Sequence, residues 1–232
     1  MTKTMLITGA SHGIGAATAR AAAAAGWRPV LLARSAEPLS ALAAELGPDT
    51  LTVPCDVTDW EQLTAALERA ETELGGIDAV FANAGVVTHT SFLGDDEAPP
   101  EQWRDMVLTN VYGAAITARA ALPALVRTRG HLLFTGSVAG RGIRVGNLYS
   151  ATKHAVTALA QNIRAECVDT GVRVSIVQPG LVDTDMITDE QRSRPQLEAS
   201  DVAEAVLYAV SQPARVDVNE IVVRPTGQHP LR

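Results

Sequence analysis

A tyrosine and a lysine stand four residues apart in the segment YSATK, residues 149–153. Lys3 and Lys153 are the only lysines among the 19 basic residues, and the others are arginines. On a helix, side chains at this spacing lie on one face, so the Tyr149 phenol and the Lys153 ammonium would be neighbours. A neighbouring ammonium favours the phenolate and lowers a phenol pKa of about 10 toward neutrality, as a general acid and base requires. The alternative is an exposed helix-face pair worth a few tenths of a kcal/mol, and the scarcity of lysine favours the chemical interpretation.

A second segment with chemical potential is TGASHGIG, residues 8–15, which carries glycines at positions 9, 13 and 15. Glycines in this arrangement allow a tight turn and a close approach of the backbone to a ligand. A helix that begins here would direct its free amides and its dipole at an anion such as a pyrophosphate. The alternative is an ordinary strand-to-helix turn, but its place after the first strand favours nucleotide binding.

These residues must be positioned by elements that alternate along the whole chain. Short apolar runs without period-2 alternation predict strands buried on both faces at 4–8, 28–33, 50–55, 78–82, 131–135, 173–178 and 220–224. Alanine-rich segments with helical spacing separate them at 14–25, 38–46, 60–74, 101–128, 150–169 and 199–211. This order predicts a doubly wound α/β sheet of about seven parallel strands with helices on both faces, formed as a single domain by residues 1–232.

Two stretches, 86–100 and 181–198, fit neither pattern and follow strand ends. Open α/β sheets bind ligands beyond the carboxyl ends of their strands, so both stretches are expected to form pocket walls. We expect 181–198 to be the substrate loop.

The composition excludes several classes of partner. The net charge is −7 and the sequence contains no basic stripe, so nucleic acid is not an expected partner. No window approaches 18 uninterrupted apolar residues, and the N-terminal apolar run, 5–7, is shorter than the h-region of a signal peptide. We therefore expect a cytoplasmic protein that does not enter membranes. Cys55 and Cys167 are too few for a disulfide framework, and the scattered histidines give no metal site; these are His12, His89, His131, His154 and His229.

Seven segments occur in the order typical of the short-chain dehydrogenase/reductase family, and together they resemble it over nearly the whole chain. They are TGASHGIG (8–15), CDVTD (55–59), NAG (83–85), TNVYG (109–113), GSVAG (136–140), YSATK (149–153) and QPG (178–180). The resemblance implies a Rossmann-type fold that binds a nicotinamide dinucleotide and interconverts a carbonyl and an alcohol.

The resemblance places the cofactor on the glycine-rich turn and on the strand ends that follow it. The implied cofactor-binding residues are Gly9, Ser11, His12, Gly13, Ile14, Gly15, Arg34, Asp56, Val57, Asn83, Ala84, Gly85, Tyr149, Lys153, Pro179, Gly180, Val182 and Thr184. Asp56 and Val57 would border the adenine, and Asn83 to Gly85 the adenosine ribose. Thr184 would contact the nicotinamide carboxamide.

The end of the second strand, LLARS (31–35), distinguishes the two nicotinamide cofactors. NAD enzymes place an acidic residue here to bind the ribose 2′-hydroxyl, whereas this chain has Ala33 followed by Arg34. A guanidinium pairs well with a 2′-phosphate, so NADP(H) is the expected cofactor. The alternative is that Arg34 is a solvated residue after a strand. Many NADP-using relatives also carry a basic residue where this chain has His12.

The same resemblance assigns the catalytic residues Asn110, Ser137, Tyr149 and Lys153. Tyr149 would pass a proton to the substrate oxygen, Ser137 would polarise that oxygen, and Lys153 would bind the nicotinamide ribose and act on the phenol. Asn110 would hold a water in a proton relay. Each has a structural alternative, such as a turn role for Ser137 and a local helix irregularity for Asn110.

The substrate and the assembly are less defined by the sequence. The ending NEIVVRPTGQ (219–228) resembles an NADP-dependent branch that contains 3-hydroxy-acid and serine dehydrogenases and clavulanate-type aldehyde reductases. A small hydroxy or oxo acid is thus the first expected substrate, and Arg141 and Arg144 are either its carboxylate partners or solvated loop charges. Relatives form dimers and tetramers through the helices 101–128 and 150–169 and the last strand, so a homo-oligomer is expected.

Two other functions remain open at this point. A regulator that binds NADPH without turnover would be expected to lose the tyrosine or the lysine, and this chain keeps both. A nucleotide-sugar epimerase or dehydratase shares the Tyr-x-x-x-Lys pair but usually has a larger C-terminal substrate region.

Overall fold

The computed structural model describes residues 2–94 and 98–228. Seven parallel strands form one sheet in the order β3-β2-β1-β4-β5-β6-β7. Their bounds are β1 Thr4–Thr8, β2 Arg28–Ala33, β3 Leu51–Pro54, β4 Ala79–Ala82, β5 His131–Thr135, β6 Arg173–Pro179 and β7 Glu220–Val223. The predicted fold class and each predicted strand are confirmed.

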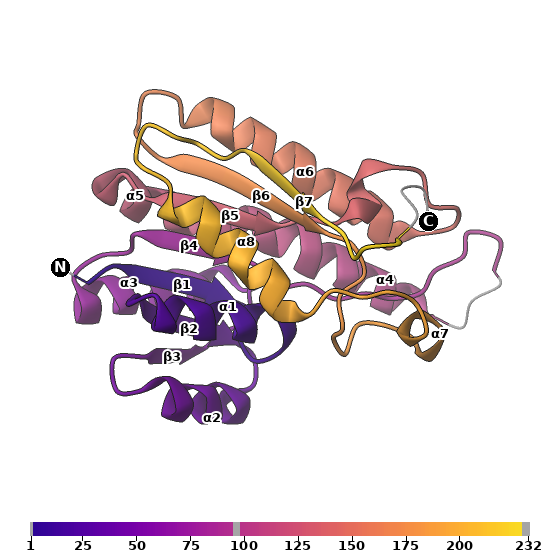
Figure 1. Cartoon of the computed structure of the whole chain (residues 1–232), viewed down its shortest axis with the longest axis horizontal. Helices are drawn as coiled ribbons and strands as arrows, with labels where there is room; N and C mark the ends of the chain where they lie inside the picture. The colour runs from indigo at the N-terminus through magenta and orange to yellow at the C-terminus, as the bar shows by residue number, and fades with distance from the viewer. Residues whose placement is uncertain (1, 95–97, 229–232) are drawn as a thin grey trace.

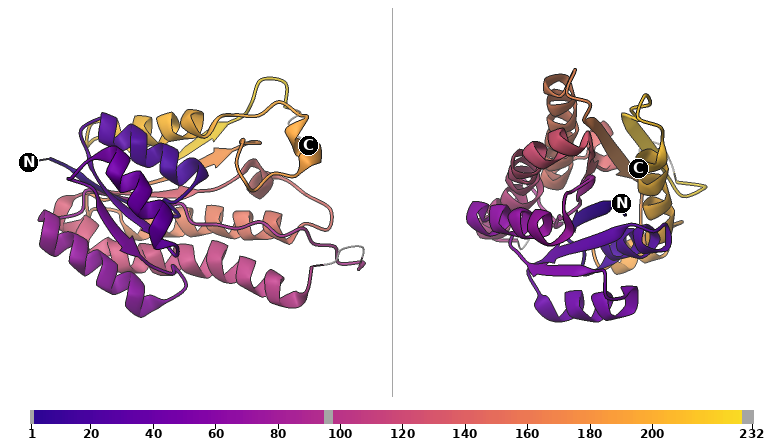
Figure 2. Two further views of the ribbon diagram at one scale, coloured as in Figure 1. Left: turned by 90° about the horizontal axis from the view of Figure 1, so that it is seen from below. Right: turned by 90° about the vertical axis from the view of Figure 1, so that its left-hand side faces the viewer.

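Helices cover both faces of this sheet (Figures 1 and 2). The helices α1 (Gly13–Ala24), α2 (Ala36–Leu46) and α8 (Ala199–Ser211) contribute to one apolar core, with α1 and α8 side by side. The helices α3 (Trp60–Leu74), α5 (Ala114–Thr128) and α6 (Leu148–Glu166) contribute to the other. The two cores take alternate residues of the same strands, which explains why the strands read as unbroken apolar runs.

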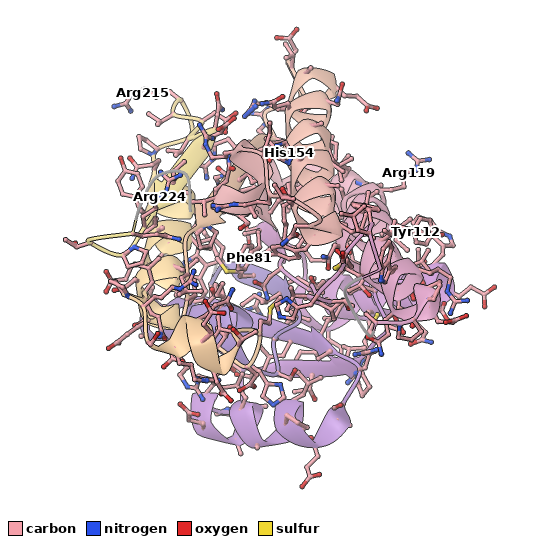
Figure 3. The ribbon with its side chains drawn as sticks, turned by 90° about the vertical axis from the view of Figure 1, so that its right-hand side faces the viewer. Phe81, Tyr112, Arg119, His154, Arg215 and Arg224 are labelled. Atoms are coloured by element: carbon pink, nitrogen blue, oxygen red, sulfur yellow. The ribbon has the colours of Figure 1, made fainter. Side chains whose placement is uncertain are left out.

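The central strands are buried on both faces. All residues of β1 and β4 are buried, and Phe81 of β4 lies at the middle of the sheet when it is viewed from the carboxyl ends of the strands (Figure 3). Cys55 and Cys167 are both free and buried. Within the described part of the chain, no helix combines the length and the apolar character needed to cross a bilayer.

The helix predicted at 101–128 is interrupted. The helix α4 (Pro100–Val107) passes into a π-helical segment, η1 (Leu108–Gly113), before α5 begins at Ala114. The segment packs closely on the loop after β3 at Gly113, where a Cβ would lie 2.9 Å from the Val57 side chain. It places Asn110 on the buried side of the helix. The irregularity that the asparagine suggested in the sequence is therefore present.

The two stretches that resisted assignment lie beyond the carboxyl edge of the sheet (Figure 1). The stretch 181–198 contains one short helix, α7 (Asp189–Arg192), capped by Thr188. The connection between β5 and α6 forms a 3-10 turn, η2 (Val138–Arg141), and Asn147 caps α6 by accepting a hydrogen bond from the Ser150 amide. Residues 95–97 of the stretch 86–100 lie outside the described residues.

Candidate active site

A cleft of about 1240 Å³ lies along the carboxyl edge of the sheet. It spans the point between β1 and β4 where the strand order reverses direction, since β2 and β3 lie on one side and β5 to β7 on the other. Open α/β sheets bind their ligands at this switch point. The two stretches predicted as pocket walls contribute Val86, Val87 and His89 from one side, and Leu181, Val182 and Thr184 to Ile187 from the other.

The cleft brings together nearly all of the residues singled out from the sequence. Those that line it are Gly9, Ser11, His12, Gly13, Ile14, Arg34, Asp56, Val57, Asn83, Ala84, Gly85, Ser137, Tyr149, Lys153, Pro179, Gly180, Val182 and Thr184. Gly15 and Asn110 do not line it but support residues that do.

The glycine-rich turn is held tightly against the end of β4. Gly9 and Gly13 have φ angles of 64° and 53°, a region where a Cβ is disfavoured. A Cβ at Gly15 would lie 2.2 Å from the Gly9 carbonyl oxygen, so the helix α1 could not begin here with another residue. Asn83 fixes the turn by donating from Nδ2 to the Thr8 and Gly9 carbonyl oxygens. The backbone at this turn is therefore shaped to contact an anion closely, as a dinucleotide pyrophosphate requires.

Tyr149 and Lys153 lie in the first turns of α6, and Ser137 follows β5 opposite them. The Lys153 Nζ donates to the Thr135 carbonyl oxygen at 2.8 Å and lies 5.6 Å from the centroid of the Tyr149 ring. Lys153 is 4% exposed, although its side chain reaches the cleft. The three side chains thus come from two elements that meet at one end of the cleft.

Burial dominates the electrostatics of this pair. It raises the pKa of the Tyr149 phenol to about 12, against a smaller lowering by a hydrogen bond with Ser137. It also lowers the pKa of Lys153 to about 8. The sequence-based prediction of a lowered phenol pKa was wrong for the protein alone, because loss of solvent disfavours the phenolate more than nearby groups favour it. Tyr149 therefore keeps its proton near neutral pH and is a donor.

Asn110 connects the π-turn to the loop after β4. Its Oδ1 accepts from the Val86 amide at 2.8 Å, and its Nδ2 donates to the Val86 carbonyl oxygen at 2.9 Å. The same Nδ2 also donates to Thr152 Oγ1 at 3.2 Å. Asn110 thus fixes the cleft wall at Val86 and the α6 turn beside Lys153.

The end of β2 presents no carboxylate to the cleft. Ala33 is buried there, and the exposed Arg34 lines the cleft. The nearest carboxylate along the next strand, Asp56, accepts hydrogen bonds from the Thr58 amide and hydroxyl through Oδ1. Helix α3 is capped by Asp59, whose side chain accepts from the Glu61 and Gln62 amides.

The structure adds cleft residues that sequence reasoning missed. Gly227 and Gln228, beyond the last strand, return to line the cleft beside Gly180. A Cβ at Gly180 would lie 2.0 Å from Gln228 Oε1, so this glycine lets the C-terminal segment close over the turn after β6. Ordinary sequence patterns carry no signal for this return.

The two loop arginines behave differently. Arg141 Nη1 pairs with Glu220 Oε2 at 2.7 Å and does not line the cleft, whereas Arg144 does line it. Among the described residues, no three histidine, cysteine or acidic side chains cluster in a way that could hold a metal ion. His229, one of the scattered histidines, lies outside those residues.

The buried ammonium should reduce the stability of the fold. A fall in the Lys153 pKa from 10.5 to about 8 corresponds to a cost of about 3 kcal/mol for holding the charge. We expect Lys153→Met to raise the free energy of unfolding at about pH 7 by about 1 to 3 kcal/mol, the lost hydrogen bond to Thr135 offsetting part of the gain. Urea unfolding monitored by circular dichroism measures this difference.

The direction in which the free energy of unfolding changes with pH follows from proton binding at Lys153. Between about pH 8 and pH 10.5 the unfolded chain holds more protons at Lys153 than the folded one, so the wild type gains stability as pH rises. The advantage of Lys153→Met should therefore shrink toward pH 10. The matched control is Lys3→Met, which removes an exposed ammonium 5.6 Å from the Trp27 ring centroid and should lower stability by at most about 1 kcal/mol. A Lys153→Met variant less stable than the wild type at pH 7 would contradict the account.

Comparisons with known proteins agree with this geometry. A family model described as short chain dehydrogenase matches residues 3–195. An uncharacterised oxidoreductase of Staphylococcus aureus (strain MRSA252) is 38% identical over 227 residues, which cover 96% of this chain and 97% of that relative. An alcohol dehydrogenase structure from the archaeon Thermococcus sibiricus has a TM-score of 0.91 at 32% identity and covers 100% of both chains. Serine dehydrogenase from Escherichia coli has a TM-score of 0.86 at 31% identity, covering 97% of this chain and 99% of that one.

The matched segments, the sheet order and the cleft agree with these comparisons. The chain therefore belongs to the short-chain dehydrogenase/reductase family of oxidoreductases.

Proposed function

We propose that the protein is an NADP(H)-dependent oxidoreductase that interconverts a carbonyl and an alcohol on a small substrate. The observation that carries the proposal is that Ser137, Tyr149 and Lys153 line the same cleft as the glycine-rich turn and Arg34. On this proposal residues 1–232 act as one dinucleotide-binding and catalytic domain, and 181–198 forms its substrate side.

The bound dinucleotide supplies or accepts the hydride. In reduction, Tyr149 donates its proton to the substrate oxygen, and Ser137 donates a hydrogen bond to the same oxygen as negative charge develops on it. The Lys153 ammonium lies beside the phenol ring and favours the phenolate that forms, and Asn110 holds the neighbouring backbone in place. In oxidation Tyr149 receives the proton instead.

The lining of the cleft supports the assignment of a nicotinamide dinucleotide to it. The close glycine turn suits the pyrophosphate, and Pro179, Gly180, Val182 and Thr184 are assigned to the nicotinamide end beside Tyr149. The structure of the Thermococcus sibiricus alcohol dehydrogenase is of a complex with 5-hydroxy-NADP. Because a related 3-ketoacyl-(acyl-carrier-protein) reductase from Brucella melitensis was crystallised with NADH, the choice of NADP(H) here depends on Arg34.

Removal of the phenolic hydroxyl should sharply reduce turnover. We expect Tyr149→Phe to lose at least about 10²-fold in turnover, the usual scale for a general acid, while NADPH binding largely survives. Steady-state kinetics gives the first quantity and NADPH fluorescence titration the second. Tyr112→Phe, at an exposed position away from the cleft, is the matched control. Near-normal turnover of Tyr149→Phe would rule out the assigned role.

Arg34 should determine the cofactor preference. A charge-assisted hydrogen bond is worth about 1.5 to 3 kcal/mol, so Arg34→Ala should weaken NADPH binding by about 10- to 100-fold and leave NADH binding unchanged. Arg215→Ala removes an exposed arginine outside the cleft and serves as the control (Figure 3). Equal losses for NADPH and NADH, or a wild type that prefers NADH, would contradict this assignment.

For the substrate we propose only a chemical class. A small hydroxy or oxo acid remains the first choice, in line with the similarity to a serine dehydrogenase. Of the two loop arginines only Arg144 lines the cleft, so we assign Arg144 to the substrate carboxylate. Rates with oxo acids, hydroxy acids and neutral ketones would discriminate these classes, and activity confined to neutral ketones would exclude the acids.

We also propose that the chain self-associates as a dimer or tetramer. Apolar side chains of the α4–η1–α5 helix are exposed at Val107, Leu108, Tyr112 and Val126, and Tyr112 and Arg119 point outward on the same flank (Figure 3). Light scattering at micromolar concentration should give a multiple of the chain mass, and Tyr112→Glu should lower it. A monomeric wild type would contradict the proposal.

The other functions receive no support. The proton donor, the ammonium and the serine hydroxyl are all present in the cleft, which a binding regulator would not need.

A further inference from the structure

Glu220 is the meeting point of three elements that surround the candidate active site. It is the first residue of the edge strand β7. Its Oε2 accepts from Arg141 Nη1 at 2.7 Å and from Gln178 Nε2 at 3.1 Å, and its Oε1 accepts from Gln161 Nε2 at 3.3 Å. Arg141 lies in η2, which follows Ser137, and Gln178 lies in β6, next to Pro179. Gln161 lies on α6.

The contact through Arg141 reaches Ser137. Arg141 is the last residue of the turn η2. At the start of this turn, Ser137 Oγ accepts a hydrogen bond from the Ala139 amide at 3.1 Å. The Ala139 carbonyl oxygen in turn accepts from Ser150 Oγ on α6 at 2.6 Å. At Gly140 a Cβ would lie 2.6 Å from the Lys153 carbonyl oxygen. The turn therefore lies directly on the α6 segment that carries Tyr149 and Lys153, and Arg141 anchors its far end.

The contact through Gln178, on β6, reaches the residues that precede Ser137. Gln178 is fully buried, and a Cβ at Gly136 would lie 2.9 Å from its Cγ. Gly136 separates Thr135, whose carbonyl oxygen binds the Lys153 ammonium, from Ser137. Within the described residues Gln178 Oε1 has no hydrogen-bond partner, so the bond from Nε2 to Glu220 is what orients this carboxamide.

We propose that Glu220 is a positioning residue for the reaction, holding Ser137 and the Lys153 anchor at Thr135 in register through Arg141 and Gln178. This inference rests on the proposed function and deepens it. It predicts a catalytic effect from a side chain that does not line the cleft.

The electrostatics support an ionised acceptor. The hydrogen bond from Arg141 lowers the pKa of Glu220, so the carboxylate is charged near neutral pH. The Arg141 and Glu220 side chains are 40% and 29% exposed, and such pairs contribute little to global stability. A positioning role should thus appear in turnover and in local order rather than in the midpoint of unfolding.

The test compares Glu220→Ala with Glu45→Ala. The control removes the partner of Arg20, an ion pair of the same 2.7 Å length that lies away from the cleft. We expect Glu220→Ala to lower kcat by about 5- to 20-fold with the KM for NADPH changed less than about twofold, because small displacements of reacting groups are costly. Glu220→Gln, which retains an acceptor, should recover part of the loss, and Glu45→Ala should match the wild type.

A double-mutant cycle examines the route through Arg141. If Glu220 acts through this arginine, Arg141→Met combined with Glu220→Ala should lose much less than the product of the two single effects. Fully multiplicative losses, or a kcat of Glu220→Ala within about twofold of the wild type, would overturn the proposal.

Amide hydrogen exchange provides a readout that needs no substrate. Glu220→Ala should speed exchange over residues 136–141 by about tenfold while leaving β1 and β4 unchanged, and Glu45→Ala should not. Unchanged exchange over 136–141 would refute the inference even if turnover fell. Inactivity of the wild type toward every carbonyl would refute the proposed function, and exchange would still decide whether Glu220 holds this segment.

Discussion

The site depends on one costly arrangement, an ammonium buried at the end of β5 with the Thr135 carbonyl oxygen as its acceptor. Burial penalises the charge of Lys153, and it also penalises ionisation of the neighbouring phenol. The two groups are kept close because α6 begins at Leu148 and because the turn η2 fits against it without space for a side chain at Gly140. The surrounding sheet supplies the rigidity that such an unfavourable pair requires.

The remainder of the cleft follows from the sheet order. The reversal between β1 and β4 opens a gap at the carboxyl edge, and the glycine-rich turn fills one side of it while the loop after β4 fills the other. Asn83 joins these two sides, and Thr135 Oγ1 donates to Asn83 Oδ1 at 2.9 Å, which extends the connection to β5. The proposed nucleotide end and the proposed proton-transfer end are thus parts of one hydrogen-bonded edge.

Much of this architecture could be predicted from the sequence because the signals are local. Apolar runs without alternation identified the strands, and the spacing of Tyr149 and Lys153 identified a shared helix face. The features that the sequence did not predict depend on contacts between residues distant in sequence. The phenol pKa was predicted in the wrong direction since burial cannot be read from spacing, and the partner of Arg141 lies 79 residues away at Glu220. The predicted roles of the site residues in turnover stay predictions, as does NADP(H) as the cofactor.

The contact between Gly180 and Gln228 also matters for how the protein is handled. The C-terminal segment returns from β7 to form part of the cleft wall, whereas β1 begins at the opposite edge of the sheet (Figure 1). An affinity tag fused after residue 232 would be attached only a few residues beyond a wall of the cleft. A tag at the N-terminus would leave from the far side of the molecule, so it is the better choice for ligand-binding measurements.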